Sequence, residues 1–415
     1  MKRRPLGKLI AATAIGIVSA FLLLELALRL LVGVGVLNDS GRTWDFYVNT
    51  YTGDGFKCTF QEALEIHPYL GWLTGPHLPC GRFNRNNRGF WDRHDLPYER
   101  NPELYTVMIT GGSVASQMAH GSGDDARPFN WLEDELNSRY QSPNGRPFRI
   151  VSGAMGGWRM PTQITTVAMF GPQVDAVISI DGYNEMTNVN IDKPLERPDA
   201  WTWYAVQSPL SGVVIIEFMK VLKYVRIVIS SAPILRDSKV LLGAFEGILS
   251  LLGDGNVATI GETEQLRNQF SYPREWTSDK AEQANVVKWQ TYILSLRATA
   301  QSMGLNYAHF IQPIPDLDKP LSDDELKRAR WITGERYLRS IVRPAEALKK
   351  QGVPVASLTS VFRGIKDTLH NDEIHCGYDE RGDNRGYRIM SRFIATSLGD
   401  LWKLKPLAKT AEAAK

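Results

Sequence analysis

A repeated alternation of short apolar runs with helical stretches constrains the fold of this 415-residue chain most strongly. The first run, 105–110, is β-branched and apolar, as expected of a buried strand. Helical patterns near 128–140 and 161–170 separate it from further short runs at 148–152 and 174–180. Such alternation predicts a parallel sheet with helices on both faces.

The same pattern returns in the C-terminal half and extends the predicted α/β domain over residues 105–400, before a tail at 401–415 that is expected to fray. Ser278 is expected to cap a helix, and Ser322-Asp-Asp-Glu325 has the form of a capping box. We therefore expect helices at 278–302, from the capping box towards Lys350, and at 385–398, with strands at 305–312 and 354–358.

Two segments depart from the alternation. Residues 40–104 are rich in Gly, Pro, Asn and aromatic residues and are expected to be a lead-in segment packed on the main domain. Residues 188–275 form an insertion whose apolar part, 212–252, carries too many charges for a membrane span. That part is either a lid or membrane-surface helix, or a helical insertion packed on the sheet, the interpretation that we favour.

The N-terminal segment, 1–39, has the pattern of a membrane anchor. A basic cluster from Lys2 to Lys8 precedes sixteen uncharged residues, Leu9 to Leu24. Glu25 and Arg29 follow four residues apart and can pair on one helix face. With this pair included, the apolar stretch is long enough to cross a hydrocarbon core of ~30 Å.

The alternative to an anchor is a cleaved signal peptide, but no convincing small-residue cleavage site follows the apolar run. The basic cluster places the N-terminus in the cytoplasm and the chain from about residue 40 outside it. We therefore expect a single span in the inner membrane with a periplasmic main domain.

Charge and cysteine content restrict the remaining classes. The net charge of +3 gives no indication of nucleic acid as a partner. Cys58 and Cys80 lie close together in the lead-in segment, while Cys376 is distant. Outside the cytoplasm, a Cys58–Cys80 disulfide is as plausible as two free thiols.

Four short segments with polar side chains or glycines follow the ends of predicted strands. In a parallel sheet, all four segments lie at the same edge. A serine with a base and an orienting group, together with fixed donors for a developing negative charge, is what acyl transfer requires. The four segments are Ser113, the glycine-rich run Ser152 to Trp158, Asp181 to Glu185, and Asn371 to His375.

These segments resemble the motif blocks of the SGNH (GDSL-like) hydrolase superfamily over residues 105–398. In the lead-in segment, Asn86 to Phe90 resembles the Asn-x-x-Gly-Phe segment of membrane-anchored bacterial members. The resemblance implies a flavodoxin-like doubly wound parallel sheet and no cofactor. It also implies that Ser113 is the nucleophile, His375 the base and Asp372 its orienting carboxylate. The implied oxyanion donors are the N–H groups of Ser113 and Gly157 and the side-chain amide of Asn184.

The chain departs from the family pattern at three positions: Gly112 replaces the usual aspartate, Ser152 the usual asparagine, and Glu185 another aspartate. None of these changes removes a catalytic atom. A competing base is His370, since Asp367 also precedes it by three residues. No recognisable zinc spacing is present, so no metal is expected.

These observations favour a membrane-anchored extracytoplasmic serine esterase that removes or transfers an O-acyl (acetyl) group on a cell-envelope polysaccharide. The substrate follows from analogy with the family, because a fold does not determine a substrate. The alternatives are a hydrolase of lipid or short-chain acyl esters and a catalytically idle scaffold in an envelope-assembly complex.

Overall fold

The computed structural model describes residues 6–34, 64–74, 84–122, 129–187, 189–191, 194–196, 238–241, 243–244, 270–317, 319–328, 334–372, 374–379 and 381–407. The chain divides into two compact units. One comprises Met1–Gly53, Lys57–Glu62 and Trp203–Thr263, and the other comprises Asp54–Phe56, Ala63–Thr202 and Glu264–Lys415. Most of the predicted insertion therefore belongs to the same unit as the N-terminal segment.

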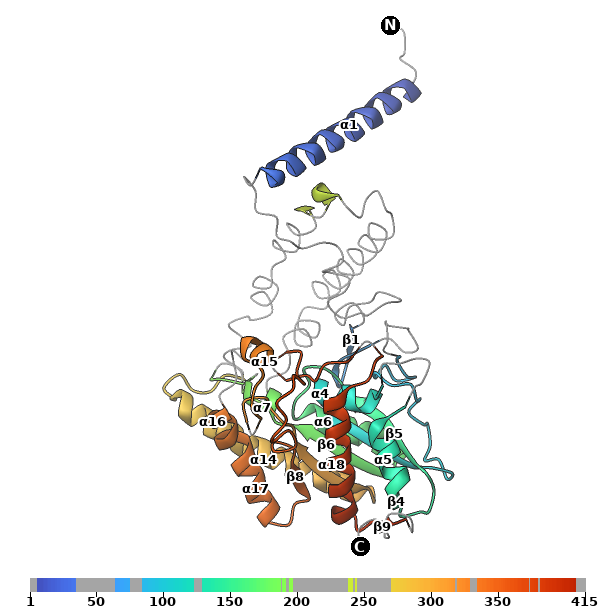
Figure 1. Ribbon diagram of the computed structural model, residues 1–415, viewed down its shortest axis with the longest axis vertical. Helices are drawn as coiled ribbons and strands as arrows, with labels where there is room; N and C mark the ends of the chain where they lie inside the picture. Colours follow the sequence, from blue (N-terminus) through green and yellow to red (C-terminus); the bar gives the residue numbers. More distant parts are fainter. Residues whose placement is uncertain are drawn as a thin grey trace. The chain divides into compact units, whose positions relative to one another are not determined.

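A five-stranded parallel sheet lies at the centre of the larger unit (Figure 1). Numbered along the chain, the strands have the spatial order 2-1-3-4-5 of flavodoxin-like sheets. Every residue of β3 is buried, as expected for a strand covered on both faces. In spatial order the strands are β5 (Phe148–Ala154), β3 (Tyr105–Gly111), β6 (Ala176–Asp181), β7 (Asn306–Ile311) and β8 (Val355–Ser357).

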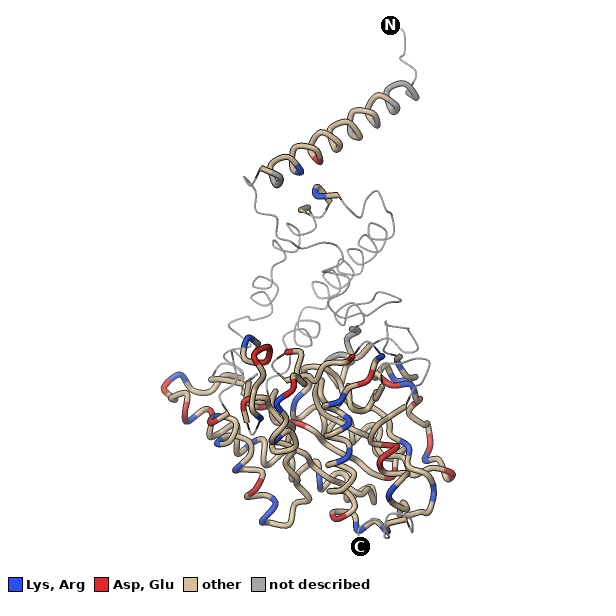
Figure 2. Tube along the Cα trace, in the orientation of Figure 1, with Lys and Arg blue, Asp and Glu red and all other residues tan. Residues whose placement is uncertain are grey.

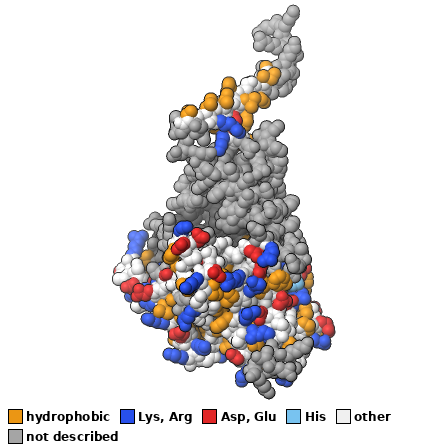
Figure 3. All heavy atoms as spheres, in the orientation of Figure 1, with side chains coloured by type: hydrophobic (Ala, Val, Ile, Leu, Met, Phe, Trp, Pro, Cys, Tyr) orange, Lys and Arg blue, Asp and Glu red, His pale blue; other side chains and the backbone are white. Residues whose placement is uncertain are grey.

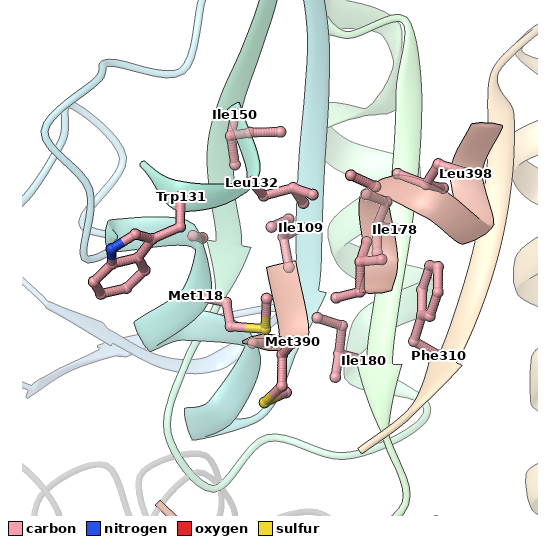
Figure 4. Packing of buried hydrophobic residues seen from close by; sticks show 14 of the residues in the cluster. Ile109, Met118, Trp131, Leu132, Ile150, Ile178, Ile180, Phe310, Met390 and Leu398 are labelled. Carbon is pink, nitrogen blue, oxygen red and sulfur yellow. The ribbon is translucent and has the colours of Figure 1, made fainter. Parts of the chain in front are cut away.

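Helices cover both faces of this sheet (Figure 1). One layer contains α4 (Ser113–His120), α5 (Trp131–Arg139) and α18 (Arg385–Leu401), and the other contains α6 (Thr162–Phe170), α14 (Ser278–Ser302) and α17 (Arg343–Lys350). Alternate strand residues fill the first layer, because side chains alternate between the faces of a strand. Figure 4 shows Ile109, Ile150, Ile178, Ile180 and Phe310 of the strands among Leu132, Met390 and Leu398 of the helices.

Local capping explains several helix boundaries. Asn130 caps α5 by accepting from the N–H groups of Leu132 and Glu133 at 3.0 and 3.1 Å. The expected cap of α14 was one residue off: Thr277, not Ser278, accepts from the Lys280 N–H at 3.2 Å. The larger unit mixes acidic and basic residues along its described trace (Figure 2).

The capping box at Ser322 and Glu325 is present, with reciprocal hydrogen bonds of 3.0 and 3.3 Å. The prediction of one helix from there towards Lys350 stays a prediction over residues 329–333, which lie outside the described residues. The short helix α15 (Asp323–Arg328) is followed by α16 (Gly334–Tyr337), a π-helical turn at Leu338–Val342, and α17. Pro344 has no N–H to donate to the preceding turn, which accounts for an irregular turn just before α17.

The lead-in segment forms the hairpin of β1 (Leu64–His67) and β2 (Gly71–Thr74). Further along, the Phe90 ring packs edge-to-face on Trp158 and Phe170, with centroid distances of 6.0 and 5.7 Å. The lead-in segment therefore contacts the face of the sheet that α6 covers. Cys58 and Cys80 lie outside the described residues, so their predicted disulfide stays a prediction.

The smaller unit contains the helix α1 (Leu6–Gly33), along which hydrophobic side chains lie exposed (Figure 3). Glu25 and Arg29 pair at 2.8 Å, as expected from their spacing. Glu25 also accepts from the Ser238 hydroxyl at 2.8 Å and from the N–H groups of Lys239 and Val240, both at 2.9 Å. Among the residues that the structure describes, no helix combines the length and hydropathy that a membrane span needs.

Candidate active site

Two glycines form the turn that places Ser113 at the carboxyl edge of the sheet. Gly111 ends β3 at a φ of 145°, where a Cβ atom would lie 2.1 Å from the Ile180 carbonyl oxygen. A Cβ atom on Gly112 would lie 2.5 Å from Nδ2 of Asn184. A side chain at either position would force a neighbouring group to shift, and the turn that the two glycines form places Ser113 at the first position of α4.

A tight hairpin carries Asp372 and His375. The Gly377 N–H donates to the Leu369 carbonyl at 2.8 Å, and the Asn371 N–H donates to the His375 carbonyl at 3.0 Å. Oδ1 of Asp372 accepts from the N–H groups of Ile374 and His375 at 2.8 and 2.7 Å. This turn leaves the second carboxylate oxygen directed at the His375 ring.

The three side chains form a continuous hydrogen-bonded chain. Nδ1 of His375 lies 2.6 Å from Oδ2 of Asp372, and Nε2 of His375 lies 2.6 Å from Oγ of Ser113. Burial raises the pKa of the Asp372 carboxyl, but the hydrogen bond and charge of His375 outweigh it, so the pKa is lowered and the carboxylate stays ionised. A hydroxyl, an imidazole and a carboxylate in this order can generate a serine nucleophile.

The three expected oxyanion donors come from adjoining elements. The Ser113 N–H belongs to the first turn of α4, where no intrahelical carbonyl accepts it. Asn184, in the short helix α7 (Tyr183–Thr187), is held by donating to the Trp158 carbonyl at 2.8 Å. Gly157, at a φ of 78°, lies in the turn that the Trp158 N–H closes onto the Met155 carbonyl.

The competing residues are engaged elsewhere. His370 is buried with Nδ1 3.1 Å from Oε1 of Glu325, and Asp367 pairs with Arg385. Cys376 is also buried, and burial together with the nearby carboxylates of Glu325 and Asp372 raises the pKa of its thiol far above the ordinary value. A cysteine in that state is not a nucleophile.

Glu185 has a role that sequence reasoning missed. Its carboxyl oxygens accept from the Met160 N–H at 3.0 Å and the Gly182 N–H at 2.8 Å. Glu185 therefore joins the loop that precedes α6 to the turn that precedes α7. Burial, with a further contribution from the charge of Asp181, raises its pKa to about 8. The only signal in the sequence was its place next to Asn184.

Ser152 is joined to Asp92 of the lead-in segment. The Ser152 N–H donates to Oδ2 of Asp92 at 2.6 Å, so this part of β5 is tied to the lead-in segment. Burial raises the pKa of the Asp92 carboxyl to about 8. This hydrogen bond uses the backbone of residue 152, and the Ser152 hydroxyl accepts from the Ala154 N–H at 3.4 Å.

A polar cavity of about 440 Å³ also opens beside Asp92, between the lead-in segment and the beginnings of β3 and β5. Neither Ser113 nor Asp372 nor His375 lines it. The hydrogen-bonded side chains, rather than the cavity volume, indicate where chemistry can occur, because a nucleophile needs its base within hydrogen-bond reach. Arg85, Arg93, His94 and Arg149 are among the lining residues.

Comparison with known proteins gives a distant structural likeness. No family model and no curated protein matches the sequence. Among solved structures, a candidate acylhydrolase from Bacteroides fragilis NCTC 9343 is similar at 10% identity and a TM-score of 0.32, over 74% of this chain and 91% of that chain. A likeness this distant carries no argument about this chain, so function has to come from the side chains at the sheet edge.

Proposed function

We propose that this protein is a serine hydrolase that cleaves or transfers acyl groups held in ester bonds. The single observation that supports it best is the 2.6 Å contact between Ser113 Oγ and His375 Nε2, with Asp372 on the other ring nitrogen. Hydrogen-bond reach between nucleophile and base, with the base held by a third group, is the requirement for activating a serine.

In the proposed reaction, Oγ of Ser113 attacks the ester carbonyl carbon while Nε2 of His375 takes the hydroxyl proton. The resulting oxyanion is stabilised by the N–H groups of Ser113 and Gly157 and by the Asn184 amide. Collapse breaks the ester C–O bond, and the imidazolium returns the proton to the leaving alkoxide. Water, or an acceptor alcohol in a transfer, then attacks the acyl-serine by the same route.

We further propose that the protein is anchored in the inner membrane and acts on O-acyl, in particular acetyl, groups of an envelope polysaccharide. The basic cluster before Leu9 and the uncharged run to Leu24 support the anchor. The substrate rests on analogy with membrane-anchored members of the family that the motifs resemble. In this arrangement the chain from about residue 40 onward faces the periplasm.

A hydrolase of lipid or short-chain acyl esters is the second candidate, and one contact favours it. Glu25 of α1 binds Ser238 and the two following amides, so part of the insertion lies against the apolar helix. If α1 lies in the bilayer, this contact places residues 238–240 near lipid. A catalytically idle scaffold is less well supported, because an idle protein has no need of a hydrogen-bonded Ser113–His375–Asp372 chain.

The proposed reaction is tested with the purified full-length chain in detergent, on a panel of acetylated glycans, short-chain esters and lipid esters. We expect Ser113→Ala and His375→Ala each to reduce turnover by about 10⁴ to 10⁶. We expect Asp372→Asn to reduce it by about 10² to 10⁴, because the amide disfavours the productive imidazole tautomer. Wild-type turnover by Ser113→Ala would refute the serine mechanism, and the preferred ester would decide between the two substrate classes.

The proposed topology is tested by a reporter that is active only outside the cytoplasm, fused after Lys415. Activity of the fusion is expected, with a reporter that works only in the cytoplasm as its matched control. A signal from the cytoplasmic reporter alone would refute the periplasmic placement while leaving the serine chemistry untouched.

A further inference from the structure

Glu325 is a buried carboxylate at the base of the hairpin that carries Asp372 and His375. Its Oε1 atom accepts from the N–H groups of Leu369 and His370 at 3.0 and 3.1 Å and lies 3.1 Å from Nδ1 of His370. Its Oε2 atom accepts from the Ser322 N–H at 3.0 Å and from the Lys319 ammonium. One side chain of α15 therefore bonds both its own helix start and the strand that leads into the hairpin.

The Lys319 ammonium makes this burial tolerable. The side chains of Lys319 and Glu325 are each 1% exposed, and Lys319 also donates to the Pro320 carbonyl at 3.1 Å. Burial raises the pKa of the Glu325 carboxyl, but the hydrogen bonds from Lys319, Ser322 and Leu369 more than reverse this, so the pKa lies far below its usual range. The group is therefore a fixed anion with a paired charge, as a buried carboxylate requires.

The hairpin connects the residues that Glu325 binds at its base to His375 at its tip. His370 pairs with Cys376 in an antiparallel bridge, and Cys376 directly follows His375. On the opposite side, Nδ2 of Asn384 donates to the Cys376 carbonyl at 2.7 Å while Oδ1 caps α18. Glu325 and Asn384 thus hold the two strands of the hairpin, and the 2.6 Å contact between His375 and Ser113 lies at its tip.

We infer that Glu325, with Lys319 as its counter-charge, is a positioning residue for the Asp372–His375 pair. This inference rests on the proposed serine hydrolase function. Glu325 acts through the amides of Leu369 and His370 and touches no reacting atom. A base displaced by about 1 Å lowers the rate by on the order of 10²-fold. Loss of the Glu325 carboxylate is therefore expected to lower kcat rather than raise KM.

The experiment removes the Glu325 carboxylate together with the Lys319 ammonium, so that no unpaired charge is left buried. In the pair Lys319→Met/Glu325→Leu both charges and the acceptor oxygens are lost, whereas Lys319→Met/Glu325→Gln retains one acceptor oxygen for the two amides. The matched control is Asp324→Asn/Lys327→Met, which removes the exposed 3.3 Å ion pair of the same helix. Steady-state turnover of one ester is normalised to the active sites titrated by a phosphonate. Amide hydrogen exchange of the peptide covering 369–377 is measured for the same proteins.

We expect the leucine pair to lose about 10- to 100-fold in kcat, with KM within twofold, and to show faster exchange at Leu369 and His370. The glutamine pair is expected to recover most of both quantities, and the control to match the wild type. The inference is overturned if the leucine pair keeps wild-type kcat or exchange, or if the glutamine pair is as impaired as the leucine pair. These results differ from a failure of the proposed function, which would appear as wild-type turnover by Ser113→Ala and would remove the positioning role with it.

Discussion

Replacing Gly112 with alanine probes the oxyanion site through a single methyl group. The added Cβ atom would lie 2.5 Å from Nδ2 of Asn184 and 3.2 Å from the Trp158 carbonyl oxygen that this amide binds. An ordinary contact begins at 3.4 Å, so the Asn184 amide would have to retreat by about 0.9 Å, which is 3.4 minus 2.5. Asn184 is buried, which leaves it little freedom to turn aside without moving α7.

A retreat of that size takes the amide out of hydrogen-bond reach of the oxyanion. Loss of one preorganised donor typically lowers kcat by about 10² to 10³, equivalent to about 2.7 to 4 kcal/mol of transition-state stabilisation. We therefore expect Gly112→Ala to lower kcat by this factor, with a smaller change in KM. The matched control is Gly16→Ala, which adds the same methyl group where nothing lies within 4 Å.

A double-mutant cycle with Asn184→Ala tests the route of the effect. If Gly112→Ala acts through the amide, then Gly112→Ala/Asn184→Ala should lose no more kcat than Asn184→Ala alone, because the truncated side chain leaves room for the methyl group. Turnover is measured per phosphonate-titrated active site. Retention of kcat within twofold by Gly112→Ala, or full additivity in the cycle, would show that the methyl group does not act by displacing the Asn184 amide.

Two further predictions concern stability and the lead-in segment. Burial raises the folded-state pKa of Asp92 to about 8, so between about pH 4 and 8 the folded protein binds more protons than the unfolded chain and loses stability as the pH rises. Denaturant midpoints at pH 5 and pH 8 should therefore differ less in Asp92→Asn than in the wild type, and an unchanged difference would contradict the assignment. Mass mapping without reduction should find the Cys58 and Cys80 peptides linked, and alkylation of both thiols would contradict that pairing.

The sheet and its edge were accessible from the sequence because both depend on short-range patterns. Apolar runs alternating with helical periods indicate a parallel sheet, and parallel strands present their carboxyl ends at one edge. Ser113 and His375 are separated by 262 positions, yet the structure places them in contact. Ser113 comes directly after the turn that ends β3, and His375 lies in the loop between β8 and α18. Helix α4 was missed because its sequence, SVASQMAH, is short and carries no strong capping signal.

The buried carboxylates around the site could not be predicted in the same way, because their positions depend on polar contacts between residues far apart in the sequence. Glu325 was identified only as a capping-box residue, a role that requires one hydrogen bond to Ser322. That it is buried against Lys319 and binds the hairpin 44 residues further along depends on how the strands are spaced. Asp92 and Glu185 are similar cases, because backbone amides supply their partners and amides carry no sequence signature.

Gly112 shows where reasoning by family pattern needs the structure. The resemblance treats this position as an aspartate without a direct chemical role, which implies that restoring it is harmless. In this chain the Asn184 amide occupies the space that any side chain at 112 would need, and an aspartate adds a carboxylate next to the proposed oxyanion site. We therefore expect Gly112→Asp to lose at least as much kcat as Gly112→Ala, by the same displacement and by repulsion of the developing negative charge. The test compares the turnover of one ester by the two variants. If the aspartate variant is more active than the alanine variant, the loop rearranges around residue 112. The close contact with Asn184 is then not what excludes a side chain there.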